Sequence, residues 1–127
     1  MLERLVYRSL ATRDFGSLAL FNLLTQAQLR NERLQITGHL LYHEGRFTQC
    51  IEGPSDSLDQ LWQSLLQDDR HRDIELMLRR PISERRFVEW SMAFSTYRSL
   101  YVHGMRGFFP VEQDGQSPLV PLCMTGD

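Results

Sequence analysis

The chain has 127 residues, of which 42% are hydrophobic and 24% charged, values typical of one globular domain. Fourteen Lys and Arg residues against sixteen Asp and Glu residues give a formal net charge of -2. Because this balance lacks the basic excess that binds a phosphate backbone, we expect no general nucleic-acid binding.

Signals for targeting, membrane insertion and metal binding are missing from the sequence. Neither a signal peptide nor about 18 consecutive apolar residues occurs, so we expect a cytoplasmic protein without a membrane span. Cys50 and Cys123 form no CxxC pattern, and we expect both thiols to be reduced. His39 and His43 lie four residues apart, but no third ligand follows at a useful spacing. We therefore predict a solvated histidine pair on a strand and no metal site.

The first part of the chain predicts a strand and then a helix. Residues 2–9 alternate loosely between apolar and polar side chains, which indicates a strand. Asp14 or Ser17 can cap a helix in which apolar residues then recur at helical spacing. We expect Asn31 to fall just after that helix.

The middle of the chain predicts a hairpin followed by a second helix. Strands are expected at residues 37–43 and 46–52, because Glu44-Gly45 suits a two-residue turn with positive φ. A helix opening at Pro54 and Ser55 then carries apolar residues at i, i+3, i+4, i+7 and i+8. This predicted stripe consists of Leu58, Leu61, Trp62, Leu65 and Leu66.

Two further strands are predicted at residues 73–80 and 86–94, separated by a turn that contains Pro81. The element order is therefore β-α-β-β-α-β-β, and both amphipathic helices are expected on one face of a single sheet. The first six elements match the split β-α-β arrangement, which predicts an α+β, ferredoxin-like fold. Its first and third strands are then antiparallel neighbours at the centre, while the position of the fifth strand stays open.

The predicted domain covers residues 1–94, and the pattern changes after it. Residues 95–109 predict a short C-terminal helical extension, since apolar side chains recur there at helical spacing. This helix could cover the second face of the sheet or meet another subunit, and the sequence does not choose. Residues 110–127 are rich in Gly, Pro, Asp and Ser, which predicts a flexible tail.

One polar side chain falls among residues that should be buried. On the third strand, Gln49 shares a face with Phe47 and Ile51, and an unpartnered buried amide costs about 1–3 kcal/mol. Tyr7 on the neighbouring first strand and Asn31 near the first helix could share its pocket. Each residue alone is more simply a structural amide, a core tyrosine or a helix-end residue. Their convergence favours a bound ligand with a polar edge.

Short motifs along residues 2–94 resemble one known family in a single register. These motifs are Arg4-Leu5-Val6-Tyr7, Asn31, Ile36-Thr37-Gly38, Leu40-Leu41-Tyr42, Gly45-Arg46-Phe47-Thr48-Gln49, Glu52-Gly53-Pro54, Asp68 with Arg70-His71, Arg86-Phe87 and Trp90-Ser91-Met92. They resemble the BLUF domain family of flavin-binding blue-light sensors, and here a short stand-alone member of it.

The resemblance implies FAD, with FMN or riboflavin as alternatives, held non-covalently between the two helices. It makes Tyr7 the electron and proton donor to the excited flavin. Gln49 would bridge the Tyr7 hydroxyl and the N5/C4=O edge of the flavin. Asn31 would bond that carbonyl and the neighbouring ring nitrogen.

Further site residues follow from the same resemblance. Trp90 and Met92 would form a light-responsive layer beside the photoactive pair, and Arg30 occupies a position that differs among family members. The stretch that lines the flavin site is matched by Asp68, Arg70 and His71.

The function implied is photosensing rather than catalysis. Light would drive transfer from Tyr7 and a hydrogen-bond rearrangement at Gln49, giving a reversible red-shifted signalling state. With no effector segment after the sensor, we expect a homo-oligomer that signals by protein–protein contact to an effector in another chain. Two alternatives are a flavin-free ferredoxin-like interaction module and a small acylphosphatase-like hydrolase, whose loop would have to use Arg13 and Gly16.

Overall fold

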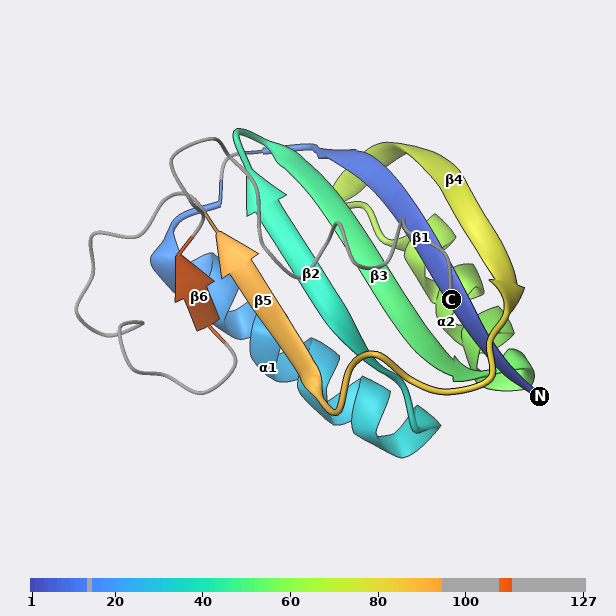
Figure 1. The fold of residues 1–127 in the computed structure, drawn as a ribbon. Helices are drawn as coiled ribbons and strands as arrows, with labels where there is room; N and C mark the ends of the chain where they lie inside the picture. The colour runs from blue at the N-terminus through green and yellow to red at the C-terminus, as the bar shows by residue number, and fades with distance from the viewer. Residues whose placement is uncertain (14, 95–107, 111–127) are drawn as a thin grey trace.

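The described residues form a six-stranded sheet with both helices on one of its faces (Figure 1). The computed structural model describes residues 1–13, 15–94 and 108–110. The strand order across the sheet is β4-β1-β3-β2-β5-β6. The strands are β1 (Leu2–Ala11), β2 (Thr37–His43), β3 (Arg46–Pro54), β4 (His71–Pro81), β5 (Trp90–Phe94) and β6 (Phe108–Pro110). The helices are α1 (Ser17–Leu34) and α2 (Ser55–Gln67).

The strand pairing confirms the predicted α+β, ferredoxin-like fold. Strand β1 pairs antiparallel with β3 on one side and with β4 on the other, and β2 pairs antiparallel with β3. The structure also places the fifth strand, which the sequence could not. It lies beside β2 and runs parallel to it.

Helix α1 begins and ends at positions that differ from the prediction. Gly16 is the N-cap and no side chain caps the helix, so Ser17 is its first residue and not its cap. Asp14 lies outside the described residues. At the other end Gln35 adopts φ 59°, and Asn31 stands inside the last turns of the helix instead of after it. The sequence shows no glycine there, so the left-handed residue that ends α1 is not visible in it.

Helix α2 buries a narrower stripe than the sequence indicates. Leu58, Leu61 and Leu65 are 0%, 0% and 5% exposed and pack against β1 and β3, whereas Leu66 is 49% exposed. The prediction is wrong for Leu66, because α2 packs on the sheet from one side only. A residue next to Leu65 is rotated about 100° around the helix axis, away from the sheet.

Two glycines explain the close pairing of the central strands. Glu44 and Gly45 have φ values of 49° and 76°, which confirms the two-residue hairpin turn between β2 and β3. Gly38 in β2 has φ 155°, and a Cβ added there would lie 2.1 Å from the Cys50 carbonyl oxygen. Only glycine therefore allows β2 to approach β3 at this point.

Strand β5 is shorter than predicted, and the chain before it is a loop. Residues 82–89 form a loop that connects β4 to β5. The predicted strand does not begin at residue 86, because the backbone N–H groups of Arg86 and Phe87 donate to a side chain and not to a neighbouring strand. Most of the predicted C-terminal helix, residues 95–107, lies outside the described residues, as do residues 111–127 of the predicted tail. Phe108–Pro110, predicted as helix end and tail, form β6 parallel to β5. Pairing with a distant strand overrides the local helical pattern there.

The face of the sheet away from the helices buries polar groups. His39 is 0% exposed and its ring stacks on Phe87 of the loop at 6.5 Å, so the predicted solvated histidine pair is wrong for His39. Cys50 on the same face is disulfide-bonded, so the expected reduced thiol is also wrong. The partner of Cys50 lies outside the described residues. The prediction failed because two cysteines that are far apart in the sequence can still be close in the folded chain.

Acid should destabilise the fold through His39. Burial lowers the pKa of His39 from 6.5 to about 4, so between these values the unfolded chain binds more protons than the folded one. Neutral His39 therefore contributes fully to the free energy of unfolding above pH 6.5. As the pH falls toward 4, this contribution is lost, and the free energy of unfolding falls by up to about 3 kcal/mol. Urea unfolding across this range should show a weaker pH dependence in His39→Gln. His43→Gln, at the end of β2, is the control, and equal slopes for parent and His39→Gln would contradict the prediction.

Candidate functional site

The register of β1 and β3 brings two predicted site residues into direct contact. Tyr7 stands opposite Gln49, and both side chains lie on the helix-facing side of the sheet. The Tyr7 hydroxyl donates a hydrogen bond of 2.7 Å to Gln49 Oε1. With exposures of 3% and 2%, the two groups form a buried neutral pair. Gln49 therefore has the partner that its buried position demands.

The surroundings of Tyr7 keep its phenol protonated. Burial raises the pKa of Tyr7, and among the nearby charges Arg30 and Arg70 oppose this while Asp68 adds to it. Trp62 and His71 contact the ring edge-to-face, with centroids at 5.9 and 6.1 Å. The protonated Tyr7 hydroxyl donates to the side-chain carbonyl of Gln49. The two amide hydrogens of Gln49 are then available for another acceptor.

A small cavity between α1 and α2 adjoins this pair. Its volume is about 30 Å³, above the roughly 10–15 Å³ that a cavity needs to hold one water molecule. Its walls combine apolar side chains with amide, phenol and charged groups. The lining residues are Tyr7, Leu23, Ala27, Arg30, Leu40, Phe47, Gln49, Leu65, Asp68, Arg70 and His71.

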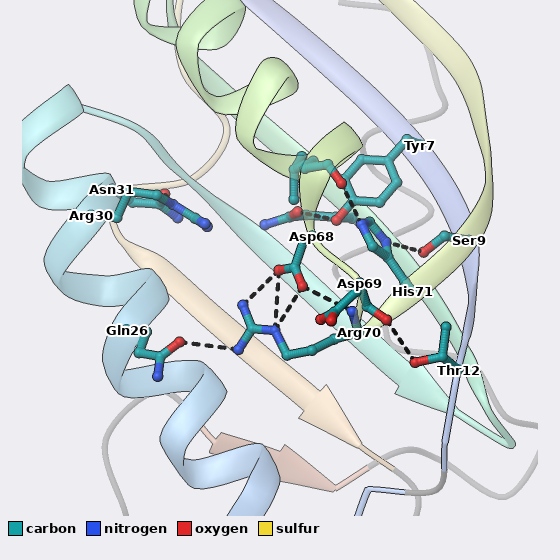
Figure 2. A network of polar contacts seen from close by, with 12 residues as sticks. Tyr7, Ser9, Thr12, Gln26, Arg30, Asn31, Asp68, Asp69, Arg70 and His71 are labelled. Atoms are coloured by element: carbon teal, nitrogen blue, oxygen red, sulfur yellow. Dashed lines mark hydrogen bonds and ion pairs between the residues drawn. The ribbon is translucent and has the colours of Figure 1, made fainter.

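Asn31 carries a buried polar group without a partner. The residue is 0% exposed, and its Oδ1 accepts a hydrogen bond of 3.2 Å from Arg30 Nε. Its Nδ2 finds no acceptor among the described residues, and such a group costs about 1–3 kcal/mol. Figure 2 shows the Asn31 and Arg30 side chains extending from α1 toward the middle of the site. Asn31 lines a different and larger cavity of about 800 Å³, so the structure places it beside the small cavity and not within its lining.

An ion pair after α2 closes one side of the site. Asp68 accepts hydrogen bonds from the Arg70 guanidinium at 2.6–3.1 Å and from the Arg70 backbone N–H at 3.0 Å (Figure 2). Burial alone would raise the pKa of Asp68, but the hydrogen bonds from Arg70 outweigh it and hold this pKa below its usual value. Arg70 also donates to Gln26 Oε1 of α1 at 3.0 Å, so the pair links the end of α2 to the middle of α1.

His71 ties α2 to β1. Its Nε2 lies 2.7 Å from the Leu65 carbonyl oxygen, and its Nδ1 lies 2.8 Å from Ser9 Oγ (Figure 2). A carbonyl oxygen can only accept, so Nε2 carries the proton and a neutral ring accepts from Ser9 through Nδ1. Sequence reasoning missed Ser9 and Gln26. Ser9 could have been found, because it lies two residues after Tyr7 and so on the same face of β1.

Trp90 borders the site from β5. It is 5% exposed and belongs to the apolar cluster that includes Leu40 and Phe47, two residues of the cavity wall. Its Nε1 has no partner among the described residues. The backbone of Met92 pairs with Leu40 of β2, while its side chain lies outside what the structure describes.

Within residues 1–13, 15–94 and 108–110, no three His, Cys, Asp or Glu side chains are grouped to hold a metal ion. No helix in this part of the chain is long and apolar enough to cross a membrane.

Comparisons with known proteins identify the family. A family model described as sensors of blue-light using FAD, the BLUF family, matches residues 2–93. A photoactivated adenylate cyclase subunit beta of Euglena longa is 39% identical over 119 residues, 93% of this chain and 13% of that protein. The dark-state structure of BlrB, a BLUF protein, has a TM-score of 0.68 and 37% identity and covers 75% of this chain and 72% of its own.

A third relative is the structure of a bacterial light-regulated adenylyl cyclase, with a TM-score of 0.70 and 31% identity over 80% of this chain and 31% of that chain. This chain therefore belongs to the BLUF family of blue-light sensors that bind flavin. It spans about an eighth of the length of the Euglena relative.

The residues at the cavity fit the chemistry of a flavin. Apolar side chains such as Leu40 and Phe47 suit the faces of an aromatic ring system, and the uncharged amide of Gln49 suits its carbonyl and nitrogen edge. Asn31 Nδ2 is a buried donor that lacks an acceptor in the part of the chain that the structure describes. Because the cavity holds only about 30 Å³, a three-ring system enters only if side chains of the lining move.

Replacing the unpaired amide should separate ligand binding from stability. In Asn31→Leu we expect flavin to bind about tenfold more weakly, because its acceptor loses a hydrogen bond worth about 1.5 kcal/mol. The free energy of unfolding of the flavin-free protein should fall by only about 1 kcal/mol, since the 3.2 Å bond from Arg30 Nε to Oδ1 is lost but no satisfied Nδ2 bond is. Fluorescence titration with riboflavin and urea unfolding measure the two effects. Asn22→Leu, an exposed amide on α1, is the control. Unchanged affinity in Asn31→Leu would contradict the prediction.

Proposed function

We propose that Tyr7 and Gln49 convert the absorption of blue light into a reversible change of hydrogen bonding. The observation that carries this proposal is their buried 2.7 Å hydrogen bond beside the cavity between the helices. A neutral pair suits a light switch, because its donor and acceptor roles can exchange without burying a new charge.

FAD is the flavin we propose for the site, bound non-covalently, with FMN and riboflavin as alternatives. When bound, its ring system supplies the absorption of blue light and, once excited, the capacity to accept an electron. Gln49 and Asn31 would hold its polar edge through their amide hydrogens. Arg30, Asp68, Arg70 and His71 would line the remainder of the site.

The photochemical step is assigned to this chain's own side chains. Tyr7 gives up an electron together with its phenolic proton. The proton leaves along the hydrogen bond from the Tyr7 hydroxyl to Gln49 Oε1. Without that proton, Tyr7 no longer holds the Gln49 amide, which becomes free to change its hydrogen bonds by rotation or tautomerisation. When electron and proton return to Tyr7, the rearranged amide remains and defines a red-shifted signalling state. Trp90 and Met92 on β5 are the proposed light-responsive neighbours.

The output of this switch is proposed to be a protein contact and not a reaction catalysed by the chain. Relatives described as photoactivated or light-regulated cyclases join a similar domain to an effector. We propose that the present chain acts as a cytoplasmic homo-oligomer on an effector protein in another chain, without contacting nucleic acid or membrane. The cavity of about 800 Å³, lined by α1 and the loop before β5, leaves polar surface near Trp90 for such a contact.

Removing either member of the pair should abolish the photoresponse and leave flavin bound. Tyr7→Phe loses the transferable proton, and Gln49→Leu loses the amide that must rearrange. Both proteins should be yellow and lack the reversible red shift under blue light, measured by absorption spectroscopy. Tyr42→Phe is the control, because Tyr42 lies in the neighbouring core cluster and does not line the small cavity. A normal photocycle in Gln49→Leu would refute its role, and a parent protein that takes up no flavin would favour the flavin-free interaction module.

Self-association should be measurable in solution. Light scattering of the purified chain in the dark and under blue light should give a mass of at least two chains. A monomer in both states would contradict this prediction. Pull-downs from dark and illuminated cells should differ by at least one bound protein, and identical sets would contradict signalling by contact.

A further inference from the structure

Several of the motifs by which the sequence resembles the BLUF family contain residues that do not line the cavity between the helices. Arg4, Glu52 and the Arg86-Phe87 pair are absent from its lining. Strand alternation places Arg4 and Glu52 on the opposite face from Tyr7 and Gln49, since each lies three residues away along its strand. The structure joins these motifs into one buried network.

The centre of this network is the carboxylate of Glu52. Arg4 and Glu52 are both 0% exposed, and Glu52 Oε2 accepts hydrogen bonds from Arg4 Nε at 3.0 Å and Nη2 at 2.8 Å. Glu52 Oε1 accepts the backbone N–H groups of Arg86 at 2.8 Å and Phe87 at 3.0 Å. A buried carboxylate needs several donors, and here half of them come from the loop that leads into β5.

Further contacts hold the same loop against the sheet. Arg85 Nη1 donates to Thr37 Oγ1 at 2.7 Å and to the Glu52 carbonyl at 3.0 Å. The Gly38 N–H donates to the Glu89 carbonyl at 3.3 Å, immediately before Trp90. The Phe87 ring also stacks on the His39 ring of β2. The loop is thus attached to β2 and β3 up to the residue where β5 begins.

We propose that Glu52 is a positioning residue for Trp90. Its carboxylate fixes residues 82–89 on the sheet and thereby sets where β5 begins and how Trp90 meets the site. It also joins β1 and β3, the strands of Tyr7 and Gln49, to the segment that carries Trp90. This second part rests on the proposed photochemical roles of Tyr7 and Gln49.

Paired double variants separate this role from charge burial. A single change at Glu52 would leave Arg4 buried without its counter-charge, so both are replaced together. Arg4→Met with Glu52→Leu removes the charges and the acceptor for the loop. Arg4→Met with Glu52→Gln removes the same charges and keeps an amide oxygen for the Arg86 and Phe87 N–H groups.

Hydrogen exchange of residues 82–90 in the dark is the direct measurement. We expect exchange about tenfold faster in the Leu variant, and exchange within about twofold of the parent in the Gln variant, which acts as the rescue. The thermal recovery of the dark state should change in the Leu variant by at least threefold, with flavin affinity unaltered. Arg8→Met with Glu75→Leu removes an exposed pair from β1 and β4 and is the matched control.

Each outcome decides one claim. Parent-like exchange in the Leu variant, or equally fast exchange in the Gln variant, overturns the positioning role. A parent without any red shift overturns the proposed photochemistry, while the dark exchange experiment still tests Glu52.

If the Leu variant does not fold, Arg86→Pro removes one loop donor and Arg86→Ala retains it. Faster exchange in Arg86→Pro than in Arg86→Ala supports the proposal, and equal exchange opposes it.

Discussion

The antiparallel register of β1 and β3 is the constraint on which the rest of the site depends. It sets Tyr7 opposite Gln49 and, three residues along each strand, Arg4 opposite Glu52. Because side chains alternate between faces, a slip by one residue would send Gln49 to the other face and break both pairs. The hairpin at Glu44-Gly45 and the close approach at Gly38 hold β2 and β3 in the same register. One alignment therefore builds a neutral pair beneath the helices and an ion pair on the far side.

The two faces of this sheet use different electrostatics, and each suits its task. Beneath the helices, the contact between Tyr7 and Gln49 is neutral, and burial keeps the phenol protonated. Neutral hydrogen bonds can exchange partners in a low-dielectric site without exposing an uncompensated charge. On the far face, the Glu52 carboxylate binds Arg4 and two loop amides. Breaking a buried ion pair by removing one partner is costly, which suits a fixed anchor better than a switch.

The candidate site also contains buried polar groups that lack a hydrogen-bond partner among the described residues. Asn31 Nδ2 and Trp90 Nε1 are buried donors without acceptors in this part of the chain, and both residues line the cavity of about 800 Å³. Other buried polar groups, such as His71 in the cavity wall and Glu52 on the far face, have hydrogen-bond partners on distant elements. Unpaired donors that cluster at one place are expected where a ligand completes the hydrogen bonds.

The sequence by itself determined the element order, the central hairpin, the ferredoxin-like fold and the identity of the central pair, because these depend on local periodicity and on which residues share a strand face. It did not predict the position of β5, the end of α1 at Gln35 or the exposure of Leu66, since these depend on which elements pack together. Nor could it show that Arg4, Glu52 and the loop before β5 form one network, or that Ser9 and Gln26 anchor His71 and Arg70. Such contacts join residues far apart in the chain, and only the packed sheet and helices decide which of them meet.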